Sequence, residues 1–141
     1  MGEDTSRFEG NAVGIMVSHN AKPTVQGVEF LDNVVGIECQ TLIADGVKMS
    51  SNLFTKRSTD KQSTGIRFRR CYLSSLCVRE NFFEDVDVGI HAVFSRISLE
   101  LNLFRECKIG TLCCGRDANN TSITALHKNL YHNCKTAIKG Q

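Results

Sequence analysis

Hydrophobic and polar positions recur along the chain in a repeat of 21 to 29 residues, and each repeat is anchored on an aromatic residue. Six positions after the aromatic comes a small residue, usually glycine, which is usually followed by isoleucine. In the third repeat five extra residues lengthen this interval. A repeat of this length with β-type residues at fixed places predicts a stacked solenoid. The anchoring aromatic residues are Phe8, Phe30, Phe54, Phe83, Phe104 and Tyr131.

Each repeat holds three short runs of β-type residues: one before the aromatic, one that begins at it, and one that begins at the small residue. The longer two alternate between apolar and polar positions, as strands do. The few residues between runs are too few for a helical crossover between parallel neighbours, so equivalent runs of successive repeats must stack. The sequence therefore predicts an all-β parallel solenoid of about six coils of roughly 22 residues, with three short strands per coil.

Four repeats carry asparagine two residues before the aromatic. We expect each asparagine in a tight turn, because this residue tolerates left-handed backbone geometry, and we expect its amide to hydrogen-bond to the asparagines of neighbouring coils. The glycine at the start of the third run is expected to adopt a positive φ. The four asparagines are Asn52, Asn81, Asn102 and Asn129.

This arrangement resembles the right-handed parallel β-helix repeats of the pectate-lyase-like family, over about residues 6 to 139. The resemblance implies a right-handed solenoid. Such repeats occur in polysaccharide lyases and hydrolases, in phage tailspikes, and in non-catalytic proteins such as certain F-box substrate receptors and Shc-binding proteins, so the fold does not choose the function. A leucine-rich repeat or a β-sandwich fits the spacing less well. The motifs that carry the resemblance are Asn52-Leu53-Phe54, Asn81-Phe82-Phe83, Asn102-Leu103-Phe104 and Asn129-Leu130-Tyr131.

Composition adds limits to this picture. A chain of 141 residues that is 41% hydrophobic can bury one core, and its single proline, Pro23, gives no linker, so residues 1–141 are expected to form one domain. The net charge of +2 predicts no nucleic-acid or membrane partner. Open sheet edges at both ends of a solenoid need capping, and little chain remains for it. We therefore expect either a fragment of a longer protein or end-to-end stacking with another subunit.

The seven cysteines are an odd number, and the polar N-terminus shows no signal peptide, which together favour free thiols and an intracellular, cytoplasmic location. Most should be buried as small hydrophobic residues. Cys107 and Cys134 hold equivalent places in neighbouring coils, so a disulfide between them is the alternative. Cys77 and Cys114 are expected to point outward and to react fastest with thiol reagents. Because there is no Cys-x-x-Cys pair, we expect no metal site, and nothing indicates a cofactor.

The outward positions after each Gly-Ile form the face that enzymes of this fold use. Glycoside hydrolysis needs a pair of carboxylates, and Glu38 is the one carboxylate in these columns. A calcium-dependent lyase would need several carboxylates beside an arginine; Arg67 is present without them. Glu84, Asp85 and Asp87 are expected to form a solvated turn. The sequence therefore favours a non-catalytic protein and identifies no catalytic residue.

Arginines form the most distinctive patch on that face. Alternation places Arg67 and Arg69 on one side of a strand, with Glu38 one coil below and His91 one coil above, and Arg70 follows directly. This patch fits an acidic partner, either a peptide, a phosphate or an anionic sugar. The simpler interpretation is a solvated strand with a cross-strand pair between Glu38 and Arg67.

Two insertions, Thr55–Thr64 and Gly115–Ser122, lengthen turns on either side of the same face, and insertions confined to one side of a repeat fold often mark the binding surface. Recognition of a protein partner is thus the expected function. The alternatives are a carbohydrate-binding or carbohydrate-degrading domain, for which Tyr72, Phe82 and Phe94 are the exposed aromatic candidates, and a structural assembly module. The expected partner-binding residues are Glu38, Arg67, Arg69, His91, Lys56, Arg57, Lys61 and Arg116.

Overall fold

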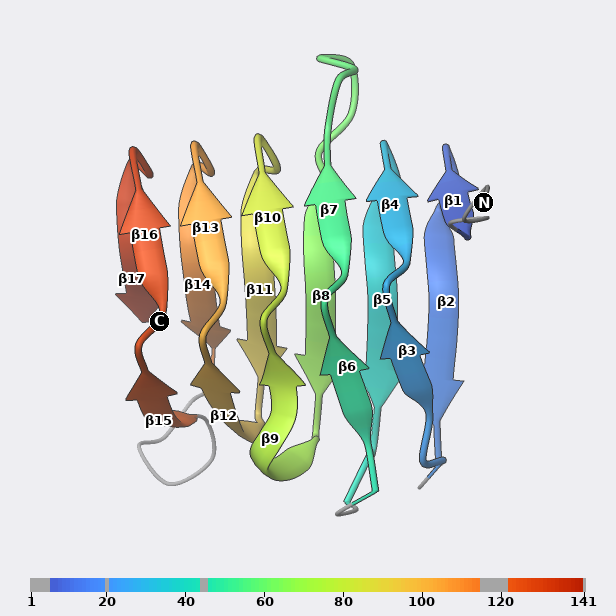
Figure 1. The fold of residues 1–141 in the computed structure, drawn as a ribbon, viewed down its shortest axis with the longest axis vertical. Coiled ribbons are helices and arrows are strands. Elements are labelled where there is room, and N and C mark those ends of the chain that lie inside the picture. Colours follow the sequence, from blue (N-terminus) through green and yellow to red (C-terminus); the bar gives the residue numbers. More distant parts are fainter. Residues whose placement is uncertain (1–5, 20, 44–45, 115–121, 141) are drawn as a thin grey trace, which may run out of the picture.

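The structure is a computed structural model that describes residues 6–19, 21–43, 46–114 and 122–140. Over these ranges the regular elements are all β-strands, β1 to β17, which stack into a solenoid (Figure 1). Every pairing between neighbouring strands is parallel. The all-β parallel solenoid predicted from the repeat is confirmed. Within the described ranges the structure has no helix that could cross a membrane.

Three sheets run the length of the solenoid: five coils contribute one strand to each sheet, and the last two described strands, β16 and β17, extend sheets A and B. Sheet A contains β1 (Arg7–Glu9), β4 (Glu29–Leu31), β7 (Leu53–Thr55), β10 (Phe82–Glu84), β13 (Leu103–Arg105) and β16 (Leu130–His132). Sheet B contains β2 (Val13–Ser18), β5 (Val35–Gln40), β8 (Thr64–Arg69), β11 (Val88–Val93), β14 (Ile109–Cys114) and β17 (Thr136–Gly140). Sheet C contains β3 (Thr24–Gln26), β6 (Lys48–Ser50), β9 (Tyr72–Arg79), β12 (Arg96–Glu100) and β15 (Ser122–His127).

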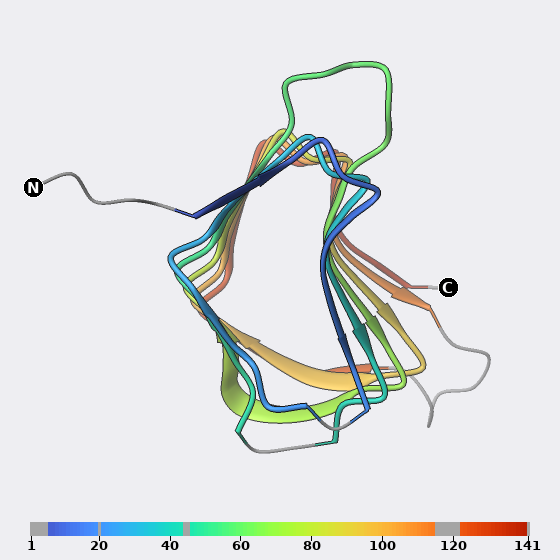
Figure 2. The same cartoon turned by 90° about the vertical axis from the view of Figure 1, so that its right-hand side faces the viewer.

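The solenoid winds with a right hand. In Figure 1 the chain advances from right to left, rises along the nearer strands of sheets C and A, and descends along the more distant strands of sheet B. Figure 2, which looks along the solenoid, shows the three sheets as the sides of a closed cross-section. The segment 56–63, between β7 and β8, projects from the corner where sheet A turns into sheet B.

A continuous stack of aromatic rings fills the core beside sheet A. Successive ring centroids are 4.7 to 5.5 Å apart and the rings are nearly parallel. This spacing follows from the distance of about 4.8 Å between neighbouring strands, so the repeat of the chain fixes the repeat of the stack. The stacked residues are Phe8, Phe30, Phe54, Phe83, Phe104 and Tyr131.

The glycine column in sheet B exists because the aromatic stack leaves no room for a side chain. A Cβ atom on Gly36 would lie 2.6 Å from the carbonyl oxygen of Gly65 and 2.8 Å from the ring of Phe54, both in the next coil. The expectation that these glycines have a positive φ is wrong, since Gly10 and Gly27, outside this column, are the glycines that do within the described chain. The requirement is close approach of one coil to the next.

Left-handed backbone geometry occurs instead at most of the described corners between sheets, mostly in residues other than glycine. At the corner after sheet C the left-handed residue precedes the asparagine: Ser51, with φ of 55°, comes before Asn52, and Glu80, with φ of 57°, comes before Asn81. The expected geometry is therefore displaced by one residue. The left-handed residues after sheet B, which matter for the site below, are His19, Thr41, Arg70 and Phe94.

The asparagines form the ladder that the spacing predicted. The Nδ2 atom of Asn52 donates to Oδ1 of Asn81 at 3.0 Å, and Asn81 donates in the same way to Asn102 at 3.1 Å. Asn102 continues the ladder to Asn129 at 3.0 Å. Each amide also donates to a backbone carbonyl of the preceding coil, as Asn81 does to Met49. Buried polar groups are thereby satisfied at every step of the corner.

All seven cysteines are free thiols. Cys107 and Cys134 lie in neighbouring coils without a bond between them, and burial, with the neighbouring Cys134, raises the pKa of the Cys107 thiol. The expectation that Cys77 points outward is wrong, because its exposed fraction is 2%. Its strand contains a bulge: Leu73 pairs with Ile97 and Val78 with Leu99, so four residues of β9 oppose one of β12, and simple alternation no longer holds.

Candidate functional site

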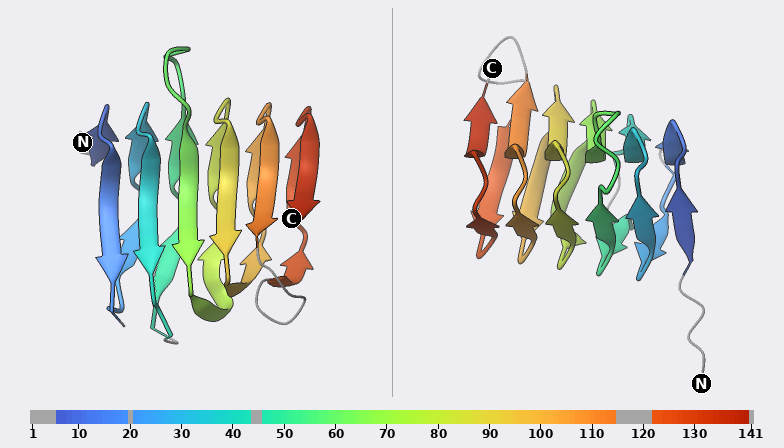
Figure 3. Two further views of the ribbon diagram at one scale, coloured as in Figure 1. Left: turned by 180° about the vertical axis from the view of Figure 1, so that it is seen from behind. Right: turned by 90° about the horizontal axis from the view of Figure 1, so that it is seen from above.

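The outer face of sheet B brings four of the predicted residues together. Arg67 in β8 is aligned with Glu38 in β5 on one side and with His91 in β11 on the other. Arg69 lies two residues further along β8 and therefore on the same face. The left-hand view of Figure 3 shows these strands side by side from outside the solenoid.

Glu38 is buried beneath the two arginines, although its column faces outward. Its side chain is 2% exposed. The Nε atom of Arg67 donates to Oε1 of Glu38 at 2.7 Å, and Nη2 of Arg67 donates to the same oxygen. Arg69 Nε lies 3.7 Å from Oε2, which has no hydrogen-bond partner among the described residues. The cross-strand pair of Glu38 and Arg67 is present as expected, but the expectation of an exposed Glu38 is wrong, because the arginine side chains cover it.

A cleft of about 410 Å³ lies at the corner where sheet B turns into sheet C. Arg69 is the last residue of β8, and Arg70 follows it with φ of 55°. Because a left-handed residue turns the chain sharply, Arg70 leaves the alternation of the strand, and its side chain lines the same cleft as Arg69. We call this site the corner cleft; its lining residues are Gln40, Thr41, Arg69, Arg70, Val93 and Phe94.

A histidine and a cysteine meet on the same face beside the corner cleft. Nε2 of His91 lies 3.3 Å from Sγ of Cys114. Burial lowers the pKa of His91, with Arg67 and Arg69 adding to the effect and Glu38 opposing it. Burial raises the pKa of the Cys114 thiol. Both directions favour neutral imidazole beside neutral thiol, so the pair does not supply the thiolate that cysteine nucleophiles require.

The loop 56–63 is tied to the solenoid through Asp87. Oδ2 of Asp87 accepts hydrogen bonds from Nζ of Lys56 and from the backbone N–H of Ser63, each at 2.7 Å, and Oδ1 lies 3.1 Å from Nζ of Lys108. Burial raises the pKa of Asp87, but these hydrogen bonds outweigh burial and hold it below the ordinary value. The expectation that Asp87 belongs to a solvated turn is wrong. Lys56 is engaged in this internal ion pair, and its side chain is 15% exposed.

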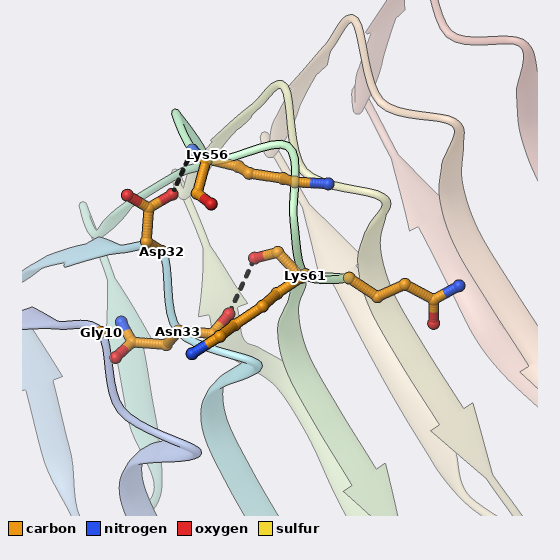
Figure 4. Close-up of a pocket in the computed structure, with 8 residues that line it drawn as sticks. Gly10, Asp32, Asn33, Lys56 and Lys61 are labelled. Carbon is orange, nitrogen blue, oxygen red and sulfur yellow. Dashed lines mark hydrogen bonds between the residues drawn. The ribbon is translucent and has the colours of Figure 1, made fainter.

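A second anchor of this loop is Asp32, shown in Figure 4. Its Oδ1 accepts the backbone N–H groups of Arg57 at 2.7 Å and Ser58 at 2.9 Å. The hydrogen bond from Ser58 lowers the pKa of Asp32, against the opposing effect of burial. The loop thereby borders an open pocket of about 100 Å³, across which the side chain of Lys61 extends toward Gly10. These contacts account for the shape of the loop.

The basic residues of the loop are not brought to the corner cleft. Arg57 and Lys61 lie before the first residue of β8, whereas Arg69 is its last residue, so the two groups stand at opposite ends of the strand. Arg116 lies outside the described residues, as does the insertion Gly115–Ser122 apart from Ser122, which begins β15.

Sequence reasoning placed Arg70 beside the patch but left it, Thr41 and Phe94 out of the binding set. Alternation alone turns Arg70 away from Arg69, and the corner geometry reverses this. The signal was the position itself, since the residues that directly follow β2, β5, β8 and β11 all have left-handed backbone geometry. Of the aromatic candidates, Phe94 lines the cleft, while Tyr72 belongs to sheet C and Phe82 to sheet A.

The chemistry of the site is that of a cation-rich binding surface. Glu38 is the carboxylate of this face, and a second carboxylate at the separation that glycoside hydrolysis needs is not among the residues of the corner cleft. Among the described residues no three His, Cys, Asp or Glu side chains gather in a way that could hold a metal ion. Arg69 and Arg70, by contrast, present guanidinium donors to solvent, and such donors recognise anions.

Comparison of the chain with protein-family models, with curated protein sequences and with solved structures gave no match.

Proposed function

We propose that this chain is a non-catalytic β-solenoid module that recognises a protein partner through the outer face of sheet B, with an acidic segment of the partner entering the corner cleft. The observation that carries the proposal is the pair of adjacent arginines at the end of β8. Arg69 and Arg70 line one cleft, and both are exposed. The repeats are proposed to be related to pectate-lyase-like β-helix repeats, and the free thiols favour an intracellular, reducing setting.

The charge of this face supports an anionic ligand. Arg67 and Glu38 neutralise one another through two hydrogen bonds. Arg69 is 49% exposed and 3.7 Å from the nearer oxygen of Glu38, which is beyond hydrogen-bond distance. No described acidic side chain forms an ion pair with Arg70. Arg69 thus forms a long ion pair with Glu38 but no hydrogen bond to it, so its donors, like those of Arg70, remain for a partner. Arginine can bind a carboxylate through two parallel hydrogen bonds.

Recognition without catalysis fits the protonation states of the face. The pKa of His91 is lowered by burial and the pKa of Cys114 is raised by burial. Glu38 is covered by arginine side chains and is not presented to a ligand as an acid or base. A rigid sheet with short corners is also a suitable platform for a binding surface, because it positions side chains without a cost in ordering them.

The proposal is tested by binding to an immobilised array of Asp/Glu-rich peptides, neutral peptides, anionic glycans and neutral glycans. We expect binding to acidic peptides, weakened at least about tenfold by Arg69→Gln with Arg70→Gln, since hydrogen bonds to charged groups are the strong ones. Arg105→Gln is the matched control, because Arg105 is also 49% exposed but lies on sheet A.

Two results would overturn the proposal. Selective binding to glycans, lost in the double variant, would assign the cleft to carbohydrate instead of protein. If Arg105→Gln weakened the affinity for acidic peptides as much as the double variant does, binding would reflect the overall charge of the chain and not a specific site.

A further inference from the structure

The corner cleft carries more positive charge than the carboxylate beneath it balances. Arg67 and Arg69 both approach the carboxylate of Glu38, whereas Arg70 lines the cleft beside Arg69 and forms no ion pair with a described acidic side chain. The three arginines and one carboxylate leave two unbalanced positive charges at this corner. A carboxylate ligand would neutralise one of them. A ligand group with two negative charges would neutralise both.

Donor residues from two neighbouring coils line the cleft. Arg69 and Arg70 are consecutive, and with the left-handed turn at Arg70 both residues line one cleft. In the preceding coil, Gln40 and Thr41 add an amide and a hydroxyl to the residues that line the cleft. A guanidinium has five N–H donors in a planar fork, the amide of glutamine adds two donors, and the hydroxyl of threonine adds one. Donors that converge in this way suit a tetrahedral group with several acceptor oxygens better than a planar carboxylate.

The opposite wall of the cleft is apolar. It is formed by Val93 and by Phe94, which is half-buried at the corner of the next coil. The cleft volume of about 410 Å³ lies in the range of about 300 to 1,000 Å³ that is usual for small-molecule sites. It is thus large enough to hold an anionic group together with the side chain that carries it. An aromatic carrier would pack against the ring of Phe94.

Building on the proposed function, we propose that the corner cleft binds a phosphomonoester on a side chain of the protein partner, and that phosphotyrosine is the preferred form. A phosphomonoester carries about −1.5 to −2 charges at neutral pH and three strong acceptor oxygens, which match the charge surplus and the converging donors. Arg69 and Arg70 bind the phosphoryl oxygens, and Val93 and Phe94 contact the tyrosine ring.

The test uses small probes, so that no partner sequence has to be known. N-acetyl-phosphotyrosine amide, N-acetyl-phosphoserine amide, N-acetyl-sulfotyrosine amide and N-acetyl-glutamate amide are titrated into the full chain labelled with nitrogen-15, and amide resonances are followed by NMR. We expect phosphotyrosine to shift the amides of Thr41, Arg70 and Phe94 in a saturable way. Its affinity should exceed that of the sulfotyrosine probe, which has the same shape and one charge, by about tenfold, the effect of one additional charged contact.

Variants separate the roles of the cleft residues. Arg70→Gln should weaken phosphotyrosine binding by about tenfold, whereas Arg105→Gln should leave it within about twofold. Arg70→Lys keeps the charge but loses the fork, so we expect an intermediate loss. Phe94→Ser should reduce the preference for phosphotyrosine over phosphoserine. Because the comparison among probes is made on the unaltered chain, the test does not depend on any variant folding.

The outcomes distinguish this inference from the proposed function. Equal affinity for glutamate and phosphotyrosine probes at the same residues would overturn the phosphate preference and leave recognition of acidic partners standing. Binding to vesicles that contain phosphoinositides, without binding to the soluble probes, would overturn the inference in favour of a membrane ligand. Shifts from none of the probes, together with no binding to acidic peptides, would overturn both.

Discussion

Arg67 closes over the buried carboxylate of Glu38 from the neighbouring coil, with its Nε atom 2.7 Å from Oε1. The pair is at once the floor of the proposed binding face and a structural element of sheet B. Variants of this pair should therefore change the stability of the fold, whereas variants of the residues that line the corner cleft should change binding.

Removing Arg67 alone should destabilise the fold. Arg67→Met leaves the Glu38 carboxylate buried with Arg69 as its remaining cation, and breaking a buried ion pair by removing one partner costs about 3 to 5 kcal/mol. Urea unfolding gives the free energy directly. In the double variant Glu38→Gln with Arg67→Met the buried charge is gone, so most of the loss should be recovered. Equal instability of the single and double variants would contradict this account of the pair.

Filling the glycine column should destabilise the solenoid. In Gly36→Ala the new Cβ would lie 2.6 Å from the carbonyl oxygen of Gly65 and 2.8 Å from the ring of Phe54, so coils must move apart. Overpacking of this kind costs about 1 to 3 kcal/mol. Gly140→Ala is the control, because a Cβ there meets nothing within 4 Å. Thermal unfolding of the two variants should therefore show a lowered midpoint for the first and little change for the second.

Asp87 should hold the loop 56–63 in place. Asp87→Asn removes the charge that Lys56 and Lys108 share, and hydrogen bonds to charged groups contribute about 1.5 to 3 kcal/mol. The pKa of Asp87 is lowered in the folded state, so its contribution is present above the unfolded value of 3.8 and is lost as the pH falls through the folded value.

Two measurements check this prediction. Hydrogen exchange at the Ser63 amide, which donates to Asp87, should accelerate in the variant at neutral pH. The difference in unfolding free energy between the original chain and the variant should shrink below about pH 3.8. A difference that grows on acidification would be inconsistent with a lowered pKa.

His91 should make stability depend on pH near neutrality. Its pKa is lowered from 6.5 by burial and by Arg67 and Arg69, so the unfolded chain takes up the proton first as the pH falls. Stability should therefore decrease as the pH drops below about 6.5 toward the folded pKa. Urea unfolding of His91→Gln across this range should lack that component. An unchanged pH profile in the variant would exclude His91 as its source.

The fold could be predicted because stacking imposes the same requirements on every coil. The ring of Phe54 stacks on a ring of the neighbouring coil, Gly36 lies against the next coil, and Asn52 donates a hydrogen bond to the next asparagine. The repeat in the sequence therefore follows from contacts between successive coils. A positive φ at the glycines of sheet B is a wrong prediction, because close contact with the next coil, and not backbone conformation, requires glycine there. Cys77 was misplaced because the bulge in β9 interrupts alternation.

The site was only partly predictable, because the repeat pattern applies within regular strands but not at corners or insertions. The register gave the pair of Glu38 and Arg67, because both lie within regular strands. Arg70 lies at a corner, where alternation ends and the backbone turns left-handed. Asp87 meets Lys56 across 31 residues and through an insertion that no other repeat contains, so no periodic signal could indicate the contact.

Amide chemical shifts can map where an eight-residue oligoglutamate peptide binds on the chain, which tests recognition of acidic partners at the corner cleft. We predict saturable shifts centred on Thr41, Arg70 and Phe94, which weaken with added salt and are absent from the double variant Arg69→Gln with Arg70→Gln. Shifts centred on the loop 56–63 or on sheet A, or no saturable shifts at all, would contradict this prediction.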